Sequence, residues 1–425
     1  MFPVLRTAIP GPRSLLLAGE LHDVESRNVT FIDREGRFPI FWESASGCLV
    51  TDVDGNTFLD LTAAFGVAAV GHGNPRVVAA IQDQAAKLIH GMGDVHPSEV
   101  KLALARKIRE RTPGDLGGVI FGSSGGDAVE AALKSARLCS GKSGVLAFDG
   151  GYHGLTYGAL AVTARSDFRD PFAGQVPTFA RHVPYPGPDD LEVSITAIDH
   201  VLHQDETIGA VIVEPIQGRG GIRVPPSGWL VRLRALCDRT GVLLIFDEIF
   251  TGWGRTGDWF ACDHEHVIPD LLCIGKAMGG GFPISACVGR PQVMAAWDES
   301  TGESLHTSTF LGSPLGCRAA LAAISEIEDR DLPGRARTVG AYFQDRLQDL
   351  QQRRPDAILE VRGRGLMLGI RLDTRERALG MVYALLQRGV IVLPAGDGDI
   401  LEFVPPLVIE EAQIDWAVGQ IAECL

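Results

Sequence analysis

Short apolar runs alternate with amphipathic stretches through the middle of the chain. The runs are rich in valine, isoleucine, leucine and phenylalanine, and five of them span residues 119–121, 145–148, 210–213, 242–246 and 271–274. Apolar residues at helical spacing lie between them, as over 128–139 and 230–240. This alternation predicts a mostly parallel sheet covered by helices, which is an α/β architecture.

The residues that follow these five runs are glycines and polar or charged residues. They form the segments 122–127, 149–154, Glu214-Pro215, Asp247-Glu248 and Gly275-Lys276. Ligands of parallel sheets bind beyond the carboxyl ends of the strands. The pattern therefore predicts that groups from five separate segments share one site.

The two ends of the chain have a different pattern. Amphipathic stretches over 319–329 and 335–352 precede an apolar run with glycines at 361–370, which indicates a smaller α+β domain. Near the N-terminus, residues 47–60 predict a hairpin with its turn at Asp54-Gly55. We expect a large domain over residues 61–324 and a small domain formed by residues 1–60 together with 325–425.

Charge and composition narrow the class of partner. The net charge of −14 argues against a nucleic-acid partner. No apolar run approaches the roughly 18 residues that span a bilayer. Eight cysteines are scattered, mostly in apolar runs, which favours free thiols in a reducing compartment. We expect a cytoplasmic protein that binds neither membranes nor nucleic acid.

Two short patterns resemble ligand-binding motifs but lack the context that such motifs require. Residues 262–266 contain cysteine, histidine and acids, yet no second cluster follows at a zinc-site spacing. We interpret the segment as a structural turn and expect no metal. Residues 252–257 match GxGxxG, but two acids separate them from the preceding strand and no helical pattern follows, so we reject a dinucleotide site.

Lys276 is the residue with the clearest chemical implication. It follows the apolar run 271–274 and precedes Gly279-Gly280-Gly281. Most lysines are solvated surface charges, but loss of hydration lowers the pKa of an amine, and a neutral amine forms a Schiff base with an aldehyde. The aldehyde that fits such a lysine is pyridoxal phosphate (PLP), an electron sink.

Other residues at the strand ends supply groups that a PLP site requires, and each also has an ordinary structural interpretation. Ser124 with Asp127 fits a capping box, and the free N–H groups of a helix N-terminus bind phosphate. Asp247 could hold a pyridine nitrogen protonated, or cap a loop. Tyr152 could stack on the ring or pack in the core. His153 could lie beside the ring, or be a histidine satisfied by its neighbours.

The chain resembles the class III (ornithine/GABA or omega-type) aminotransferases over roughly residues 42–420. The segment 247–257 is similar to the family's Asp-Glu-Val-Gln-Thr-Gly-Phe-Gly-Arg-Thr-Gly, and the Lys276 segment is nearly the family sequence. Further matches are Val53-Asp54-Gly55, Gly71-His72, the segment 214–218 and the segment 306–310.

The resemblance implies fold type I of the PLP-dependent transferases, the fold of aspartate aminotransferase, in a homodimer with its sites at the interface. Lys276 would hold PLP as a Schiff base and then move the proton, and Asp247 would pair with the ring nitrogen. Ile249 and Tyr152 would pack on the two ring faces, and Thr309 would reach the phosphate of the neighbouring subunit. The residues expected around the cofactor are Ser124, Gly125, Gly126, Tyr152, His153, Glu214, Asp247, Ile249, Lys276 and Thr309.

Departures from the family pattern concern the substrate. The family's two carboxylate-binding arginines are replaced by Leu155 and, in an ungapped alignment, by Glu402. Its gating glutamate is replaced by Arg219, and the glutamine at the cofactor's phenolic oxygen by Phe250. A carboxylate at Glu402 would repel an anionic substrate group. The candidate substrate residues are Trp42, Phe65, Leu155, Arg219 and Glu402.

We therefore predict a ping-pong aminotransferase that passes an amino group from an amine donor to an aldehyde or ketone. The favoured acceptor is not a plain α-keto acid but an oxidised amino sugar or another biosynthetic carbonyl. The alternatives are an epimerase or aminomutase on a similar amine, an omega-amino-acid or diamine aminotransferase with a keto-acid acceptor, and a catalytically silent binding protein. Retention of Lys276 and Asp247 weighs against the last.

Overall fold

The computed structural model describes residues 2–33 and 35–425, and these form two units. One unit contains the chain up to residue 74 together with residues 338–425, and the other contains residues 75–337. The expected domain boundaries after residues 60 and 324 lie 14 and 13 residues before the corresponding unit boundaries after residues 74 and 337, and they stay a prediction. Within the described chain, no helix has the length and apolar character needed to cross a membrane.

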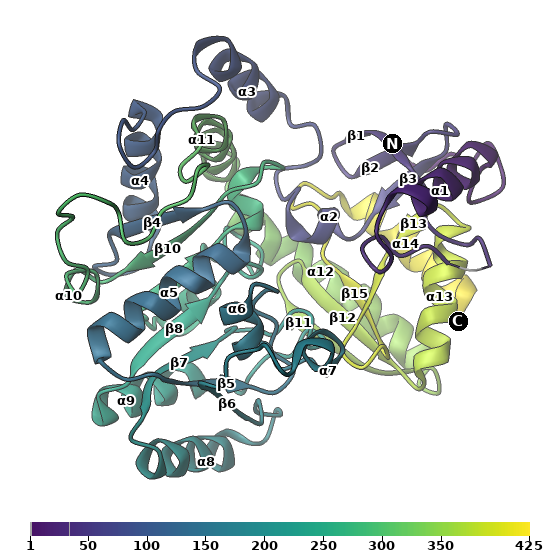
Figure 1. Ribbon diagram of the computed structural model, residues 1–425. Coiled ribbons are helices and arrows are strands. Elements are labelled where there is room, and N and C mark those ends of the chain that lie inside the picture. Colours follow the sequence, from purple (N-terminus) through teal and green to yellow (C-terminus); the bar gives the residue numbers. More distant parts are fainter. Residues whose placement is uncertain (1, 34) are drawn as a thin grey trace. The chain divides into compact units, whose positions relative to one another are not determined.

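The 75–337 unit is built on a seven-stranded sheet, shown in Figure 1. The strand order is β4-β10-β9-β8-β7-β5-β6. The strands are β4 (Gly118–Gly122), β5 (Gly144–Phe148), β6 (Ala180–Val183), β7 (Ile208–Val213), β8 (Leu243–Asp247), β9 (Leu271–Ile274) and β10 (Ser285–Gly289). Five of these strands coincide with the five apolar runs, so that prediction is confirmed.

Only β10 runs against its neighbours in this sheet; it pairs antiparallel with both β4 and β9. The other pairs, from β9 to β6, are parallel. The strand was not expected because Ser285-Ala286-Cys287-Val288-Gly289 contains one β-branched residue among small ones. Since β10 lies between β4 and β9, those two strands point the same way, and all five predicted strand ends lie at one edge.

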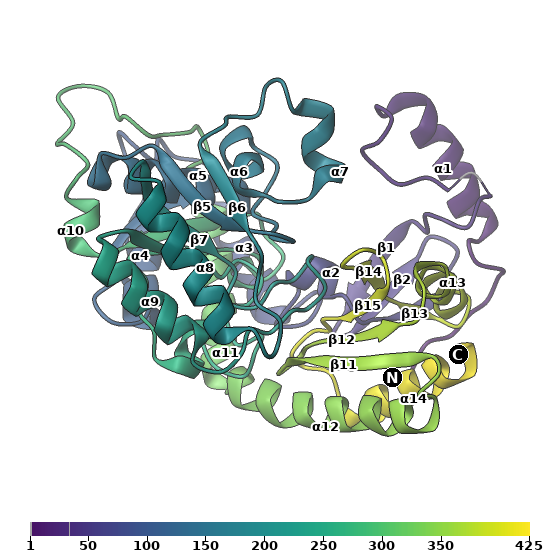
Figure 2. The ribbon, with the colours of Figure 1, turned by 90° about the horizontal axis from the view of Figure 1, so that it is seen from below.

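Helices cover both faces of the sheet. Figures 1 and 2 place α5 (Gly125–Ser140) and α6 (Tyr157–Val162) on one face, and α8 (Leu191–Gln204) and α9 (Trp229–Thr240) on the other. Alternate strand residues face opposite layers: Val145 packs in the cluster that contains the α5 alanines, whereas the Phe148 ring meets Trp229 edge-on at 5.4 Å. The remaining helices of this unit are α3 (Pro75–Lys87), α4 (Glu99–Arg111), α7 (Ser166–Arg169), α10 (Pro291–Met294) and α11 (Pro314–Asp329).

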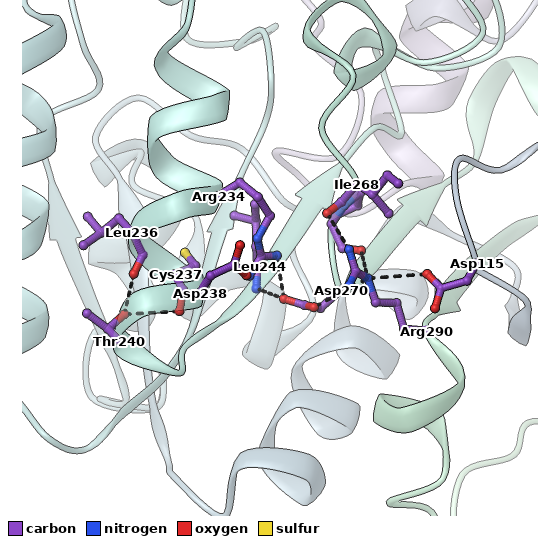
Figure 3. Close-up of polar contacts among 11 residues, drawn as sticks. Asp115, Arg234, Leu236, Cys237, Asp238, Thr240, Leu244, Ile268, Asp270 and Arg290 are labelled. Carbon is purple, nitrogen blue, oxygen red and sulfur yellow. Dashed lines mark hydrogen bonds and ion pairs between the residues drawn. The ribbon is translucent and has the colours of Figure 1, made fainter.

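A buried aspartate holds the amino-terminal edge of the sheet together, as Figure 3 shows. Asp270, just before β9, accepts hydrogen bonds of 2.7 Å from the Leu244 backbone N–H and from the Arg234 guanidinium of α9. Arg290, after β10, lies 3.7 Å from the other carboxylate oxygen and also 3.7 Å from Asp115. One carboxylate therefore links a helix and three consecutive strands.

The other unit contains two four-stranded sheets, with the orders β1-β2-β3-β13 and β11-β12-β15-β14. The predicted hairpin is confirmed, since β2 and β3 pair antiparallel around the turn at Asp54-Gly55. The strands are β1 (Trp42–Ser46), β2 (Leu49–Asp52), β3 (Thr57–Asp60), β11 (Ile358–Arg364), β12 (Met367–Leu372), β13 (Val390–Ile391), β14 (Leu393–Ala395) and β15 (Ile400–Phe403). The helices are α1 (Pro12–Val24), α2 (Ala63–Gly66), α13 (Arg375–Leu386) and α14 (Glu411–Cys424), and α12 (Leu332–Arg353) crosses the boundary between the units.

The turn α2 has an unusual backbone conformation. Ala63, Ala64 and Phe65 have φ angles of 46°, 49° and 62°, in the left-handed region that side chains rarely adopt. The buried Asp60 carboxylate holds the turn by accepting hydrogen bonds from the Thr62 hydroxyl at 2.6 Å and the Ala64 N–H at 3.1 Å. Phe65 is 58% exposed at the end of this turn.

Candidate active site

The loops at the carboxyl edge of the 75–337 sheet contact one another through their polar groups. In the loop after β5, the Tyr152 N–H donates a 2.9 Å hydrogen bond to the carboxylate of Glu214, which follows β7. The next residue of that loop, His153, contacts Asp247 at the end of β8. The structure thus brings together residues that lie 62 and 94 positions apart in the chain.

Asp247 and His153 form a buried pair. His153 Nδ1 lies 2.8 Å from Asp247 Oδ2, and the exposed fractions of the two residues are 2% and 3%. Asp247 Oδ1 accepts a 3.1 Å hydrogen bond from the Ile249 N–H, and the His153 N–H donates to the Thr163 hydroxyl. Burial opposes protonation of the imidazole, but the hydrogen bond and charge of Asp247 raise the pKa of His153 above its ordinary value.

Glu214 connects two loops of the site. Its two carboxylate oxygens accept hydrogen bonds from the N–H groups of Tyr152 and Gly218, at 2.9 and 3.1 Å. Burial raises the pKa of Glu214 to about 7, although the positive charge of His153 opposes the rise. The side chain therefore fixes the backbone on both sides of the site by using both of its oxygens as acceptors.

The start of α5 provides an anion site. Ser124 and Asp127 form the predicted capping box: the Asp127 N–H donates to the Ser124 hydroxyl at 3.2 Å, and the Ser124 N–H donates to the Asp127 carboxylate at 2.9 Å. The first helical residues are Gly125 and Gly126, whose N–H groups have no acceptor within the helix. Gly154 has φ 123°, and a Cβ there would lie 3.0 Å from Cα of Gly126, so only glycine allows this close approach.

Lys276 begins a short 3-10 turn, Lys276–Gly279, directly after β9. Its φ angle is 43°, an uncommon conformation that occurs preferentially at functional sites. The Nζ atom lies 3.6 Å from the centroid of the Phe250 ring, and Phe250 is 8% exposed. The amine therefore lies against an aromatic face, where it has fewer neighbouring waters than on the surface.

Two further residues extend the site around Tyr152 and were not predicted. The Phe168 ring meets the Tyr152 ring at 5.6 Å, and the Arg165 guanidinium lies 5.8 Å from the centre of Phe168. Arg165 also donates to the Arg219 carbonyl at 3.0 Å. Burial raises the pKa of the Tyr152 hydroxyl, and the positive charges of Arg219 and Arg165 oppose this rise. Phe168 lies in the four-residue helix α7 and Arg165 directly precedes it; this helix is too short to have a periodic pattern, so the sequence carried no signal for them.

The remaining predicted site residues differ in their exposure and in their neighbours. Leu155 is 52% exposed beside Gly154, and Thr309 is exposed in the described chain. Trp42 meets the His72 ring edge-on at 5.8 Å, and Glu402 is 2% exposed on β15, opposite Gly369 of β12. Trp42, Phe65 and Glu402 belong to the unit formed by the two ends of the chain. Their roles toward a substrate stay predictions.

The two motif-like segments that were set aside have structural contacts. In 262–266, Glu265 accepts hydrogen bonds from the N–H groups of Gly228 and Leu230 and so caps the start of α9. Asp263 accepts from the Phe260 N–H at 2.9 Å. In 252–257, Gly254 and Gly257 have φ angles of 93° and 104° in a series of turns rather than at a helix start.

The arrangement at the carboxyl edge fits PLP. The N–H groups at the start of α5, from Gly125 on, suit a phosphate. The buried Asp247 carboxylate suits a protonated pyridine nitrogen, and the Lys276 amine suits an aldehyde. Ile249 faces the same region, because a Cβ on Gly125 would lie 3.1 Å from its Cδ1. These four groups come from three separate segments, at or directly after the ends of β4, β8 and β9, at one edge of the sheet.

Comparisons with known proteins agree with this chemistry. Residues 31–425 match the family described as aminotransferase class III. The chain is 41% identical to an acetylornithine aminotransferase of Methanopyrus kandleri over 92% of this chain and 95% of that protein. A protein of the same name from Methanosarcina mazei is also 41% identical, over 91% and 92% of the two chains.

Solved structures show the same fold. The ornithine aminotransferase from Toxoplasma gondii ME49 superposes with a TM-score of 0.87 at 31% identity, covering 96% of this chain and 94% of that one. A transaminase from the marine bacterium Virgibacillus superposes with a TM-score of 0.91 at 27% identity, covering 96% and 98%. The fold is therefore type I of the PLP-dependent transferases, and the chain belongs to the class III aminotransferases, enzymes that use PLP to transfer amino groups.

Proposed function

We propose that this enzyme works by a ping-pong cycle that takes the amino group from a carboxylate-bearing donor such as glutamate. It then passes the group to an aldehyde or ketone that lacks a carboxylate at the family's usual position. The observation that carries the proposal is the Arg165 guanidinium, which donates to the Arg219 carbonyl and lies near the Phe168 ring that contacts Tyr152.

The residues of the carboxyl edge would hold the cofactor. PLP, when bound, supplies an electron sink for the bonds broken at the substrate carbon. The Asp247 carboxylate would hold a proton at the pyridine nitrogen, and His153 would keep this carboxylate oriented and ionised. The N–H groups of Gly125 and Gly126, at the capped start of α5, would bind the phosphate.

Lys276 would be the base that moves the proton. Its position after β9 is fixed by the strand, and its contact with Phe250 limits hydration of the amine. Tyr152 and Ile249 would cover the two faces of the ring. Thr309, which is exposed in the single chain, would bind the phosphate of a second subunit in a homodimer, as the family resemblance implies.

The arginine pair suits the donor's carboxylate. Guanidinium groups form bidentate hydrogen bonds with carboxylates, and such charge-assisted bonds are stronger than neutral ones. The Arg165 side chain is only 18% exposed, and its acidic neighbour Asp167, at 3.2 Å, is 70% exposed. The Arg165 guanidinium therefore contacts the Arg219 carbonyl and Phe168 as well as Asp167, close to the ring that would stack on the cofactor.

The acceptor is assigned from the two replaced arginines. Leu155 offers no charge for a carboxylate, and the buried Glu402 would disfavour one. A polar carbonyl such as an oxidised amino sugar is compatible with both. The names of the relatives favour a second candidate, an omega-amine of an amino-acid derivative such as acetylornithine, with a keto acid as the acceptor.

Half-reaction spectroscopy tests this assignment. The absorbance band of the cofactor should convert to the pyridoxamine form on addition of glutamate. In Arg165→Gln and Arg219→Gln the KM for glutamate should rise by roughly 10-fold to 100-fold with little change in kcat, the loss expected for one charge-assisted hydrogen bond. Arg181→Gln, a surface arginine of β6 that is 47% exposed, is the matched control.

The outcomes separate the candidates. If both arginine variants retain the wild-type KM for glutamate, the donor assignment is wrong. If acetylornithine converts the band in preference to glutamate, the second candidate replaces the first. Product formed from an amine without any keto acid or other acceptor would instead indicate an epimerase or aminomutase.

A further inference from the structure

A second concave region of the 75–337 unit lies away from the carboxyl edge. It is a cavity of about 460 Å³, within the range of small-molecule sites. Its floor includes Gly144 and Val145 at the start of β5 and Gly209 and Ala210 at the start of β7, so it lies at the amino-terminal edge of these strands. No residue assigned above to the active site lines it.

The walls of the cavity are mostly apolar. They include Leu133, Val145, Phe179, Ala210, Trp297 and Leu305. The Trp297 ring is fixed by a 2.9 Å hydrogen bond from its Nε1 to the Ser135 hydroxyl of α5. Leu305 is 76% exposed, so an apolar ligand that covered it would remove a large hydrophobic side chain from water.

The charged residues of the lining are mainly cationic. Lys134, Arg137 and Lys142 line the cavity, with Glu130 as the acid among the described lining residues. One Glu130 oxygen already accepts from the Thr156 hydroxyl at 2.7 Å and from the Gly158 N–H at 2.8 Å. Two of the cations contact neutral groups: Lys134 lies 3.2 Å from His306 Nδ1, and Arg137 donates to the Gly141 carbonyl.

The protonation state of His306 preserves this positive charge. Burial and the nearby Lys134 lower the pKa of His306, so the neutral ring accepts from the ammonium group instead of sharing its charge. Three cations therefore gather at an apolar cavity in a chain whose net charge is −14. Their field attracts an anion to this place although the whole protein repels it.

We propose that this cavity binds a small amphipathic carboxylate. The apolar chain of the ligand lies against the walls that contain Phe179, Trp297 and Leu305, and its carboxylate meets Lys134, Arg137 and Lys142. The apolar part supplies the hydrophobic driving force, and the cations select the head group. The site would be separate from the one that binds the amine and the carbonyl.

Calorimetric titration of the PLP-loaded enzyme with decanoate tests the proposal. Decanol and decyltrimethylammonium carry the same chain with a neutral and a cationic head. Decanoate should bind with one-to-one stoichiometry and at least about tenfold more tightly than either, the ratio expected for one or two charge-assisted hydrogen bonds. Light scattering should confirm that the probes are monomeric at the concentrations used.

Two pairs of variants locate the site. Lys142→Gln should weaken decanoate binding about fivefold without changing decanol binding, while Lys142→Arg should retain it, as expected for a partly exposed charge pair. Leu305→Asp should abolish measurable binding of decanoate. Leu102→Asp, at another leucine that is 51% exposed but does not line the cavity, should leave binding unchanged.

Three results would overturn the proposal. They are the absence of decanoate binding, equal binding of all three probes, and unchanged decanoate binding in Leu305→Asp. Thermal unfolding of each variant shows whether it is folded. If Lys142→Gln melts like the wild type and binds decanoate as tightly as the wild type, the cation has no role in binding.

Discussion

The same pair of strands, β8 and β9, has a buried aspartate at each end, and the two aspartates have different partners. Asp270, at the amino-terminal edge, is 7% exposed and has Arg234 at 2.7 Å and Arg290 at 3.7 Å. Asp247, at the carboxyl edge, is 3% exposed and has His153 as its charged partner at 2.8 Å.

The difference separates a structural carboxylate from a chemical one. Arginine stays protonated under all ordinary conditions, so the charge of Asp270 is permanently balanced and its oxygens are occupied by groups of the fold. Histidine can gain or lose its proton. Asp247 Oδ1 accepts one hydrogen bond within the described residues, from the Ile249 N–H, which leaves acceptor capacity. Equal burial therefore does not imply an equal role, and the partners decide it.

The largest expected effect comes from removing the charge at the carboxyl edge. Asp247→Asn should lower kcat by about a thousandfold, comparable to the loss of one electrostatic contact to a transition state. The asparagine keeps the shape and can still accept from the Ile249 N–H, so the melting temperature should change little. Measurements of turnover, of the amount of bound PLP and of thermal unfolding check this prediction. Lys276→Ala serves as the inactive control. A variant with wild-type kcat would contradict the chemical role.

Asp270→Ala should have the opposite profile. It leaves Arg234 buried without its carboxylate, and removal of one partner of a buried pair costs about 3–4 kcal/mol. The melting temperature should fall while kcat of the remaining folded enzyme stays near the wild-type value. Asp115→Ala, which removes a 57% exposed partner of Arg290, should change stability by less than about 0.5 kcal/mol. Similar effects of the two variants would show that Asp270 is not the link between the strands.

A pH series sharpens the comparison, because the buried Glu214 at the carboxyl edge has a pKa of about 7. The pKa of Glu214 is about 7 in the folded protein, above the ordinary value of 4.5, so the folded state binds more protons than the unfolded state between these values. Stability should therefore fall as pH rises from 5 to 8, and the raised pKa of His153 acts in the same direction.

Glu214→Gln removes part of this pH dependence. We expect the fall in stability between pH 5 and 8 to be smaller by about 2 kcal/mol, from the value of a pKa difference of this size. Thermal unfolding midpoints at several pH values measure it. Some slope should remain, since burial also raises the pKa of Glu248 to about 7. An unchanged slope in Glu214→Gln would mean that Glu214 does not titrate in this range.

The sequence predicted those features that are encoded locally. The five strands followed from apolar runs, and the Ser124 capping box from residues three positions apart. Lys276 and Asp247 were recognisable because each directly follows an apolar run whose direction the fold determines. Their location at one edge of the sheet could then be predicted, because the carboxyl ends of parallel strands lie at the same edge.

Features that depend on distant partners were not predictable in the same way. The Asp270 network joins residues 26 and 36 positions apart, and neither spacing has a periodic signal. Arg165 lies in an irregular loop, and its relation to Arg219, 54 positions away, depends on how two loops meet. The small residues of β10 gave too weak a strand pattern, so its antiparallel insertion appeared only in the structure.

The left-handed turn at Ala63–Phe65 has a consequence for engineering a new substrate range. A saturation library at positions 63 and 64 would lose its β-branched members, because such side chains are strongly disfavoured at φ angles of 46° and 49°. Glycine, asparagine and aspartate adopt this conformation more readily than other residues. A restricted alphabet at these two positions, combined with free variation at the exposed Phe65, would keep most of the library folded.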